Sequence, residues 1–252
     1  MKKILVPALI LFVSASFTAC KKEAVAVETS SYQSVTGKAG TVRGKATDTR
    51  GNSLQGVNVT VEHTVWYGTY LYATTNSNGK YSITIPPDPP GDWTAKARYS
   101  KKAYGKNYLF DMAGNTDSFM QADSAVRNFK WKISGKKPGT GSYYGAHVDL
   151  YQLGTDAQMD KITIVFTPID STLIDGSPAV AFERNVEDVA GTFMVKDVPI
   201  GKYSIRAKYP GKKLYLENRH DDKGAAVKKT VIFGKYGSLA ETEYNIEFWV
   251  SE

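Results

Sequence analysis

Hydrophobic and polar residues alternate along most of the chain after Gly40, which indicates β-strands. In "GVNVTVEHTV" (56–65), Val57, Val59 and Val61 fall on one face, the period-two pattern of a half-buried strand. No segment sustains helical spacing, and "DMAGNTDSFMQADSAV" (111–126) is either a short helix or a polar loop. The pattern therefore predicts an all-β protein.

Turn residues separate these segments at short intervals. Asn78-Gly79 is a strong hairpin signal, and it precedes Tyr81, Ile83 and Ile85 on one face of a predicted strand. "PPDPPGD" (86–92) interrupts the pattern before it resumes in "WTAKARY" (93–99). "VRNFKWKI" (126–133) predicts a further strand. Short strands with turns between them predict antiparallel β-sandwiches.

Four segments of the first half recur in the same order in the second half. They are "GVNVTVEH" (56–63) with "KITIVFTP" (161–168), "GKYSITIPP" (79–87) with "GTFMVKDVP" (191–199), "DWTAKARYSKKAYGKNY" (92–108) with "KYSIRAKYPGKKLYLEN" (202–218), and "RNFKWKI" (127–133) with "YNIEFWV" (244–250). Such order indicates duplication of one unit of domain size. We expect Tyr81 to correspond to Phe193 and Tyr99 to Tyr209.

The repeat sets the expected domain boundaries. The first sandwich is predicted at 40–134 and the second, divergent one at 143–252, joined by the Gly- and Pro-rich linker "GKKPGTGS" (135–142). Residues 20–39 show no sustained period, which predicts a flexible tether.

The N-terminus has the features of an export signal. Lys2 and Lys3 precede an apolar run, 4–17, that is shorter than the roughly 20 residues a membrane-spanning helix needs. The run leads into "FTAC", and Cys20 is the only cysteine. This resembles a bacterial lipoprotein signal of the Bacteroidota type, with Phe17 where leucine is usual. The resemblance implies removal of 1–19, a lipid on Cys20, and an outer-membrane lipoprotein with a periplasmic or surface-exposed position. The alternative is an ordinary secretory signal.

Composition and charge restrict the classes of binding partner to be expected. The 252 residues are 42% hydrophobic and 23% charged, which is ordinary for a protein with a buried core. The formal net charge is +7, and loss of Lys2 and Lys3 with the signal lowers it to +5 (7 − 2). The lysines lie in short dispersed runs, so we expect no nucleic-acid partner but a solvated surface or attraction to anionic glycans or lipopolysaccharide.

The first half resembles the carboxypeptidase regulatory-like domain, a transthyretin-like (prealbumin-like) sandwich. The residues that match its pattern are Gly40, Val42, Asp48, Gly51, Leu54, Gly56, Val57 and Val59, followed by Thr75, Gly79, Tyr81 and Pro86. The second half keeps only Gly191, Phe193, Pro199, Gly201 and Tyr203. The resemblance implies two tandem sandwiches without catalytic activity, because these modules accompany enzymes rather than perform chemistry.

Residues suited to catalysis or metal binding are sparse. His63 and His147 are expected at surface or partly buried strand positions, and "NRHDD" (218–222) contains adjacent residues that one ion would not easily meet. No zinc-peptidase motif, nucleophile elbow or cysteine nucleophile is present. We therefore expect no enzyme, no cofactor and no metal, and keep an enzyme of a transthyretin-like fold as a remote alternative.

An aromatic run is the remaining candidate site. Trp66, Tyr67, Tyr70 and Tyr72 lie within seven residues, and neighbouring rings such as Trp66 and Tyr67 must point to opposite faces of a strand. At least one ring is therefore expected to be exposed, where it would stack on a sugar or contact a protein. These residues predict a carbohydrate-binding module or, alternatively, a structural or adhesion accessory that binds an envelope protein. A wide sheet with an aromatic rim would give the same run.

Overall fold

The computed structural model describes residues 40–252, so Cys20 and the predicted signal and tether lie outside the described residues. The described part is built from β-strands, with one 3-10 turn, η1 (Met159–Lys161). The strands of the first half are β1 (Thr41–Thr47), β2 (Asn58–His63), β3 (Tyr70–Thr74), β4 (Lys80–Thr84), β5 (Asp92–Ala103), β6 (Lys106–Asp111), β7 (Ala113–Gly114), β8 (Phe119–Met120), β9 (Ser124–Val126) and β10 (Phe129–Lys130). Those of the second half are β11 (Ala146–Gln152), β12 (Thr163–Pro168), β13 (Phe182–Asn185), β14 (Glu187–Val189), β15 (Thr192–Val198), β16 (Lys202–Lys208), β17 (Tyr215–Asn218), β18 (Lys229–Ile232) and β19 (Asn245–Ser251).

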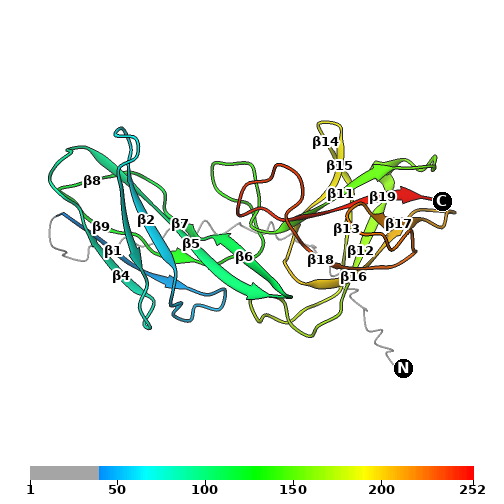
Figure 1. Cartoon of the computed structure of the whole chain (residues 1–252), viewed down its shortest axis with the longest axis horizontal. Coiled ribbons are helices and arrows are strands. Elements are labelled where there is room, and N and C mark those ends of the chain that lie inside the picture. Colours follow the sequence, from blue (N-terminus) through cyan, green and yellow to red (C-terminus); the bar gives the residue numbers. More distant parts are fainter. Residues whose placement is uncertain (1–39) are drawn as a thin grey trace, which may run out of the picture. The chain divides into compact units, whose positions relative to one another are not determined.

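The strands form two tandem β-sandwiches, as the alternation predicted (Figure 1). In the first, a sheet with the order β4-β1-β10-β7, to which β9 is added beside β1, packs with a sheet of order β3-β2-β5-β6, to which β8 is added beside β5. In the second, the sheets are β14-β15-β11-β19-β17 and β13-β12-β16-β18. Each sandwich encloses the inward-facing residues of its strands, Val57, Val59 and Val61 of the first among them.

The sheets are mixed rather than purely antiparallel. β1 pairs in parallel with β9 and β10, and β11 pairs in parallel with β19, while the other strand pairs are antiparallel. The segment 111–126 contains no helix; it carries the short strands β7, β8 and β9 between loops. The predicted strand 126–133 is interrupted, although its Phe129, Trp131 and Ile133 are all buried.

Six central strands pair in the same way in both halves. β2 pairs with β3 and β5 as β12 pairs with β13 and β16. β1 pairs with β4 and, in parallel, with β10 as β11 pairs with β15 and β19. This common arrangement is what duplication of one unit predicts.

The cross-strand register agrees with the matched sequence segments. Val59 pairs with Ala97, and Ile164 pairs with Ala207. The matched segments equate Val59 with Ile164 (164 − 59 = 105) and Ala97 with Ala207 (207 − 97 = 110), so both members of the pair correspond. Register is fixed wherever one face of a strand is buried, and both pairs lie on that face.

The halves differ in their last strands. Val42 and Val148 occupy equivalent places in β1 and β11, and their parallel partners are Ala125 and Ile246. These partners are 121 residues apart (246 − 125), whereas the matched segments 127–133 and 244–250 assumed 117. The match is therefore displaced by four residues. An even displacement keeps every side chain on its face, so the hydrophobic pattern could not detect it.

The order of the outer strands differs as well. In the first sandwich β6 comes before β7 in the chain; β6 lies beside β5, and β7 lies beside β10. In the second sandwich the equivalent positions are filled in the opposite order: β17, beside β19, comes before β18, beside β16. The repeat therefore covers six central strands, and the outer strands of the two copies are connected differently.

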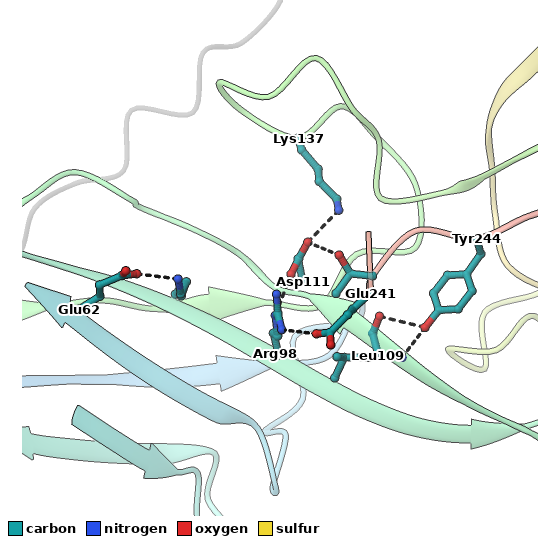
Figure 2. Close-up of polar contacts among 9 residues, drawn as sticks. Glu62, Arg98, Leu109, Asp111, Lys137, Glu241 and Tyr244 are labelled. Carbon is teal, nitrogen blue, oxygen red and sulfur yellow. Dashed lines mark hydrogen bonds and ion pairs between the residues drawn. The ribbon is translucent and has the colours of Figure 1, made fainter. Parts of the chain in front are cut away.

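Polar contacts connect the two sandwiches on the β6 side of the first (Figure 2). The hydroxyl of Tyr244 accepts the backbone N–H of Leu109 at 2.5 Å and lies 3.1 Å from the Leu109 carbonyl oxygen, to which it donates. Asp111 accepts hydrogen bonds from Lys137 (2.8 Å) and from Thr242 (2.6 Å). Lys137 belongs to the predicted linker 135–142 and is buried, so this segment is held in place by Asp111.

Candidate functional site

The predicted aromatic residues lie on the β2–β3 connection and on β3, an edge strand of its sheet. The side chains of Tyr67 and Trp66 are 97% and 58% exposed, so the expectation that at least one ring is exposed is confirmed. Tyr72 is 70% exposed and Tyr70 is half-buried. Tyr70 and Tyr72 share one face of β3, with ring centroids 6.2 Å apart.

His63, the last residue of β2, anchors the loop that carries Trp66 and Tyr67. Its Nδ1 accepts the backbone N–H groups of Val65 and Trp66, each at 3.1 Å, and its Nε2 lies 3.2 Å from the Pro90 carbonyl oxygen. This set of partners fits the neutral ring with the proton on Nε2. His63 is only 4% exposed, so the prediction of a surface or partly buried position was wrong. The reason is that the imidazole is the hydrogen-bonding centre of two loops.

The second of these loops, 86–91, closes over the same imidazole. A Cβ on Gly91 would lie 2.9 Å from His63 Nε2, so only glycine leaves room for the ring there. Thr64 reinforces the contact, because its backbone N–H and its hydroxyl both donate to the Asp92 carbonyl oxygen, at 2.9 and 3.0 Å. The His63 ring also meets the edge of Trp93, with centroids 4.8 Å apart. The aromatic loop therefore has a fixed backbone beneath exposed side chains.

Polar groups flank the rings on the outward face of the sheet. Glu62 pairs with Lys96 at 2.6 Å and lies opposite Tyr70 in the register of β2 and β3 (Figure 2 shows Glu62 in its ion pair). The negative charge of Glu62 raises the pKa of Tyr70, so its hydroxyl stays protonated and can donate. Thr60, opposite Tyr72, adds a further hydroxyl. Aromatic faces beside hydroxyl and charged groups are suited to bind a sugar, whose ring carbons stack and whose hydroxyls bond.

The remaining histidines lie elsewhere and have other partners. His147 Nε2 lies 3.3 Å from the Asp149 carboxylate in β11. His220 stacks on Tyr236 with centroids 3.9 Å apart, and its Nε2 lies 3.1 Å from Glu247. Within residues 40–252, no group of three or more His, Cys, Asp or Glu side chains is placed to hold a metal ion. Over the same residues, no helix is long and apolar enough to cross a bilayer.

Sequence reasoning predicted the exposure of the aromatic run but not the contacts that order its loop. The 86–91 loop and Lys96 come well after the aromatic run in the sequence, and the structure brings them beside it. The one available signal was the position of His63 directly before the aromatic run. Its role depends on Pro90, which lies 27 residues away.

No family model matches the chain, and no curated protein matches it. Solved structures that resemble it include the Bacillus anthracis TIE protein (14% identity, TM-score 0.32), the pilus adhesin SpaC from Lactobacillus rhamnosus GG in its open conformation (11%, 0.28) and the major pilin T-13 from Streptococcus pyogenes (13%, 0.24). They cover 84%, 84% and 86% of this chain, which spans 34%, 28% and 97% of theirs. Because these TM-scores are low, the β-sandwich assignment rests on the strand pairing itself.

Proposed function

We propose that this is a non-catalytic, lipid-anchored protein of the bacterial cell envelope that binds carbohydrate through the surface formed by Trp66, Tyr67, Tyr70 and Tyr72. The resemblance of residues 40–100 to the carboxypeptidase regulatory-like domain supports a binding role, because such modules carry no chemistry of their own. The lipoprotein-like signal ending in Cys20 supports the outer membrane, on its periplasmic or surface side.

The exposure of Trp66, Tyr67 and Tyr72 carries the proposal. These large aromatic side chains are exposed to solvent on a fixed backbone. Covering them with a ligand lowers the free energy, because apolar surface is removed from water. Because the hydrogen bonds to His63 already order the loop, a ligand would meet a preorganised backbone and the entropy cost of binding would be small. Ring stacking with neighbouring hydroxyl and charged groups favours a glycan.

A double variant, Trp66→Ala with Tyr67→Ala, tests this function. Wild-type protein is first screened on a glycan array, and the best ligand is titrated against both proteins. Each stacked ring is expected to contribute about 1 kcal/mol, so affinity should fall roughly tenfold or more while the thermal midpoint barely changes. The control variant, Met120→Ala with Val180→Ala, removes other exposed apolar side chains and should bind like wild type. An array without a ligand, or equal losses in both variants, would overturn the carbohydrate proposal.

A partner protein of the envelope is the second candidate. The contacts of Tyr244 and Asp111 between the two sandwiches favour it, because they suit a spacer that holds a binding surface at a fixed place. If the array yields no ligand but cross-linking from residue 67 captures one envelope protein, this candidate replaces the first.

Lipid anchoring is a separate part of the proposal. One acyl chain binds membranes only marginally, but two or more chains on Cys20 would anchor stably. Labelling with a palmitate analogue should mark the protein and disappear in Cys20→Ala; equal labelling of both would remove this part.

A further inference from the structure

A groove on the second sandwich has a chemical character different from the aromatic surface. It has a volume of about 560 Å³ and lies where β16 ends, against the start of β12 and the turn 209–214. Its cationic side chains are Lys161, Arg206, Lys208, Lys212 and Lys213, and its lining contains no acidic residue. Volumes of this order are typical of sites for small ligands.

Three of these cations already have carboxylate partners. Lys208 contacts Glu183 at 2.8 Å, and Lys161 contacts Asp160 at 3.5 Å. Lys212 lies between Asp156 and Glu252, and the hydrogen bonds that Lys212 and Thr155 donate lower the pKa of Glu252. Their charges are therefore largely compensated in the free protein.

Arg206 and Lys213 remain as the cations of the groove without a carboxylate partner among residues 40–252. Arg206 belongs to β16, and Lys213 lies in the turn 209–214, with its ammonium 5.3 Å from the ring centre of Tyr215. A planar guanidinium matches a carboxylate in bidentate fashion, and an ammonium adds a point charge. The pair gives the groove a local attraction for anions.

Part of the groove lining is apolar. Leu214 in the lining is buried, Val227 and Tyr209 are half-buried, and Pro210 is exposed. A ligand that fits needs apolar faces as well as negative charge. Sugar rings with carboxylates combine the two, because their C–H faces can contact the apolar side chains while their carboxylates contact the cations.

We propose that this groove binds an acidic polysaccharide, with Arg206 and Lys213 as the carboxylate-binding residues and the apolar part of the lining against a sugar ring. The site is on the other sandwich from the aromatic surface and does not depend on it. A chain that carried both sites would hold a polymer at two points and gain avidity when the polymer spans them.

The test uses a defined oligogalacturonide as the probe and a neutral maltooligosaccharide of equal length as its uncharged counterpart. Titration calorimetry on the full mature chain compares wild type with Arg206→Ala/Lys213→Ala. We expect roughly tenfold weaker binding of the oligogalacturonide, as for the loss of two charge-assisted contacts, and weaker wild-type binding as salt rises. Arg206→Gln/Lys213→Gln repeats the test with longer side chains if the alanine variant is unstable.

Lys80→Ala/Lys102→Ala is the matched control, because it removes two exposed lysines from the first sandwich and changes net charge equally. It should retain affinity within about twofold, since screening weakens charges that are far from the site. Equal losses in both double variants would show attraction by net charge and overturn the groove. So would equal affinity for the neutral oligosaccharide, or binding to anionic phospholipid vesicles without binding to the oligogalacturonide.

Discussion

Both ring nitrogens of His63 are used, and they are used by different loops. Nδ1 holds the loop of Trp66 through two backbone N–H groups, and Nε2 holds the 86–91 loop through Pro90. An unpaired buried polar group costs about 1–3 kcal/mol. A residue without these nitrogens would leave the N–H groups of Val65 and Trp66 and the carbonyl oxygen of Pro90 without this hydrogen-bond partner. The aromatic surface thus depends on a side chain that no ligand would touch.

His63→Phe tests this dependence at a single residue. The phenyl ring can keep the edge contact with Trp93 but offers neither an acceptor to Trp66 nor a donor to Pro90. We expect the free energy of unfolding to fall by about 1–3 kcal/mol and amide exchange in residues 64–69 to accelerate. His220→Phe, which changes an exposed histidine in the second sandwich, should leave exchange in 64–69 unchanged. Unaltered exchange in His63→Phe would mean that the loop is held by other contacts.

At the scale of strands, burial explains which predictions held. Val59 and Ile164 face the core opposite equivalent alanines, and this burial preserved the alternation that revealed the repeat. The parallel pairing of β10 with β1, and of β19 with β11, was not predictable, because hydrophobic alternation is the same in parallel and antiparallel strands. The outer strands were missed because half-exposed segments such as β17 carry a weak pattern.

The candidate surface follows the same rule. The exposure of the aromatic run was predictable because the neighbouring rings Trp66 and Tyr67 cannot share one face of a strand. The groove at Arg206 was not found, since its residues come from three segments between 161 and 227. Proximity of this kind is a property of the folded chain and has no local signal.

Equivalent turns of the two sandwiches provide a test at the scale of elements. Gly79 and Gly191, 112 residues apart (191 − 79), both have positive φ, at +70° and +85°. A Cβ on Gly79 would lie 2.5 Å from the Ala46 carbonyl oxygen, whereas a Cβ on Gly191 would meet nothing within 4 Å. Gly191→Ala should therefore cost about 1–2 kcal/mol from backbone strain alone. Gly79→Ala should cost a further 1–3 kcal/mol, approximately, because the strand must shift.

Urea unfolding of the two variants, followed separately by fluorescence and circular dichroism, measures this difference. The comparison is internal, because each glycine occupies the same turn of its own sandwich. Equal losses of stability would mean that β1 yields to the added methyl group and that the close approach at Ala46 is not rigid.

At the scale of the whole described chain, each sandwich supplies hydrogen-bonding groups to the contact with the other. Tyr108 donates its hydroxyl to the Phe233 carbonyl oxygen at 2.9 Å, and burial raises its pKa, so the donor stays protonated. Arg98 adds an ion pair to Glu241 at 2.9 Å (Figure 2). Because Tyr108, Thr242 and Tyr244 are buried, separating the sandwiches would expose several hydrogen bonds at once.

Asp111 makes this connection dependent on pH. Burial alone would raise its pKa, but hydrogen bonds from Lys137 and Thr242 and the charges of Lys137 and Arg98 outweigh burial and lower the pKa below the ordinary 3.8. A carboxyl with a lowered folded pKa contributes stability that is present above its ordinary pKa and is lost as pH falls through the folded value. Asp111→Asn should therefore unfold at a lower temperature than wild type at pH 7, and the difference should shrink as pH falls below about 4. Asp160→Asn, which removes an exposed carboxylate paired with Lys161, should show almost no difference at either pH, as expected for a surface pair. Thermal unfolding of the three proteins between pH 7 and pH 3 measures both effects. If the unfolding temperature of Asp111→Asn differs from that of wild type by the same amount over this whole range, the ionised carboxylate does not connect the sandwiches.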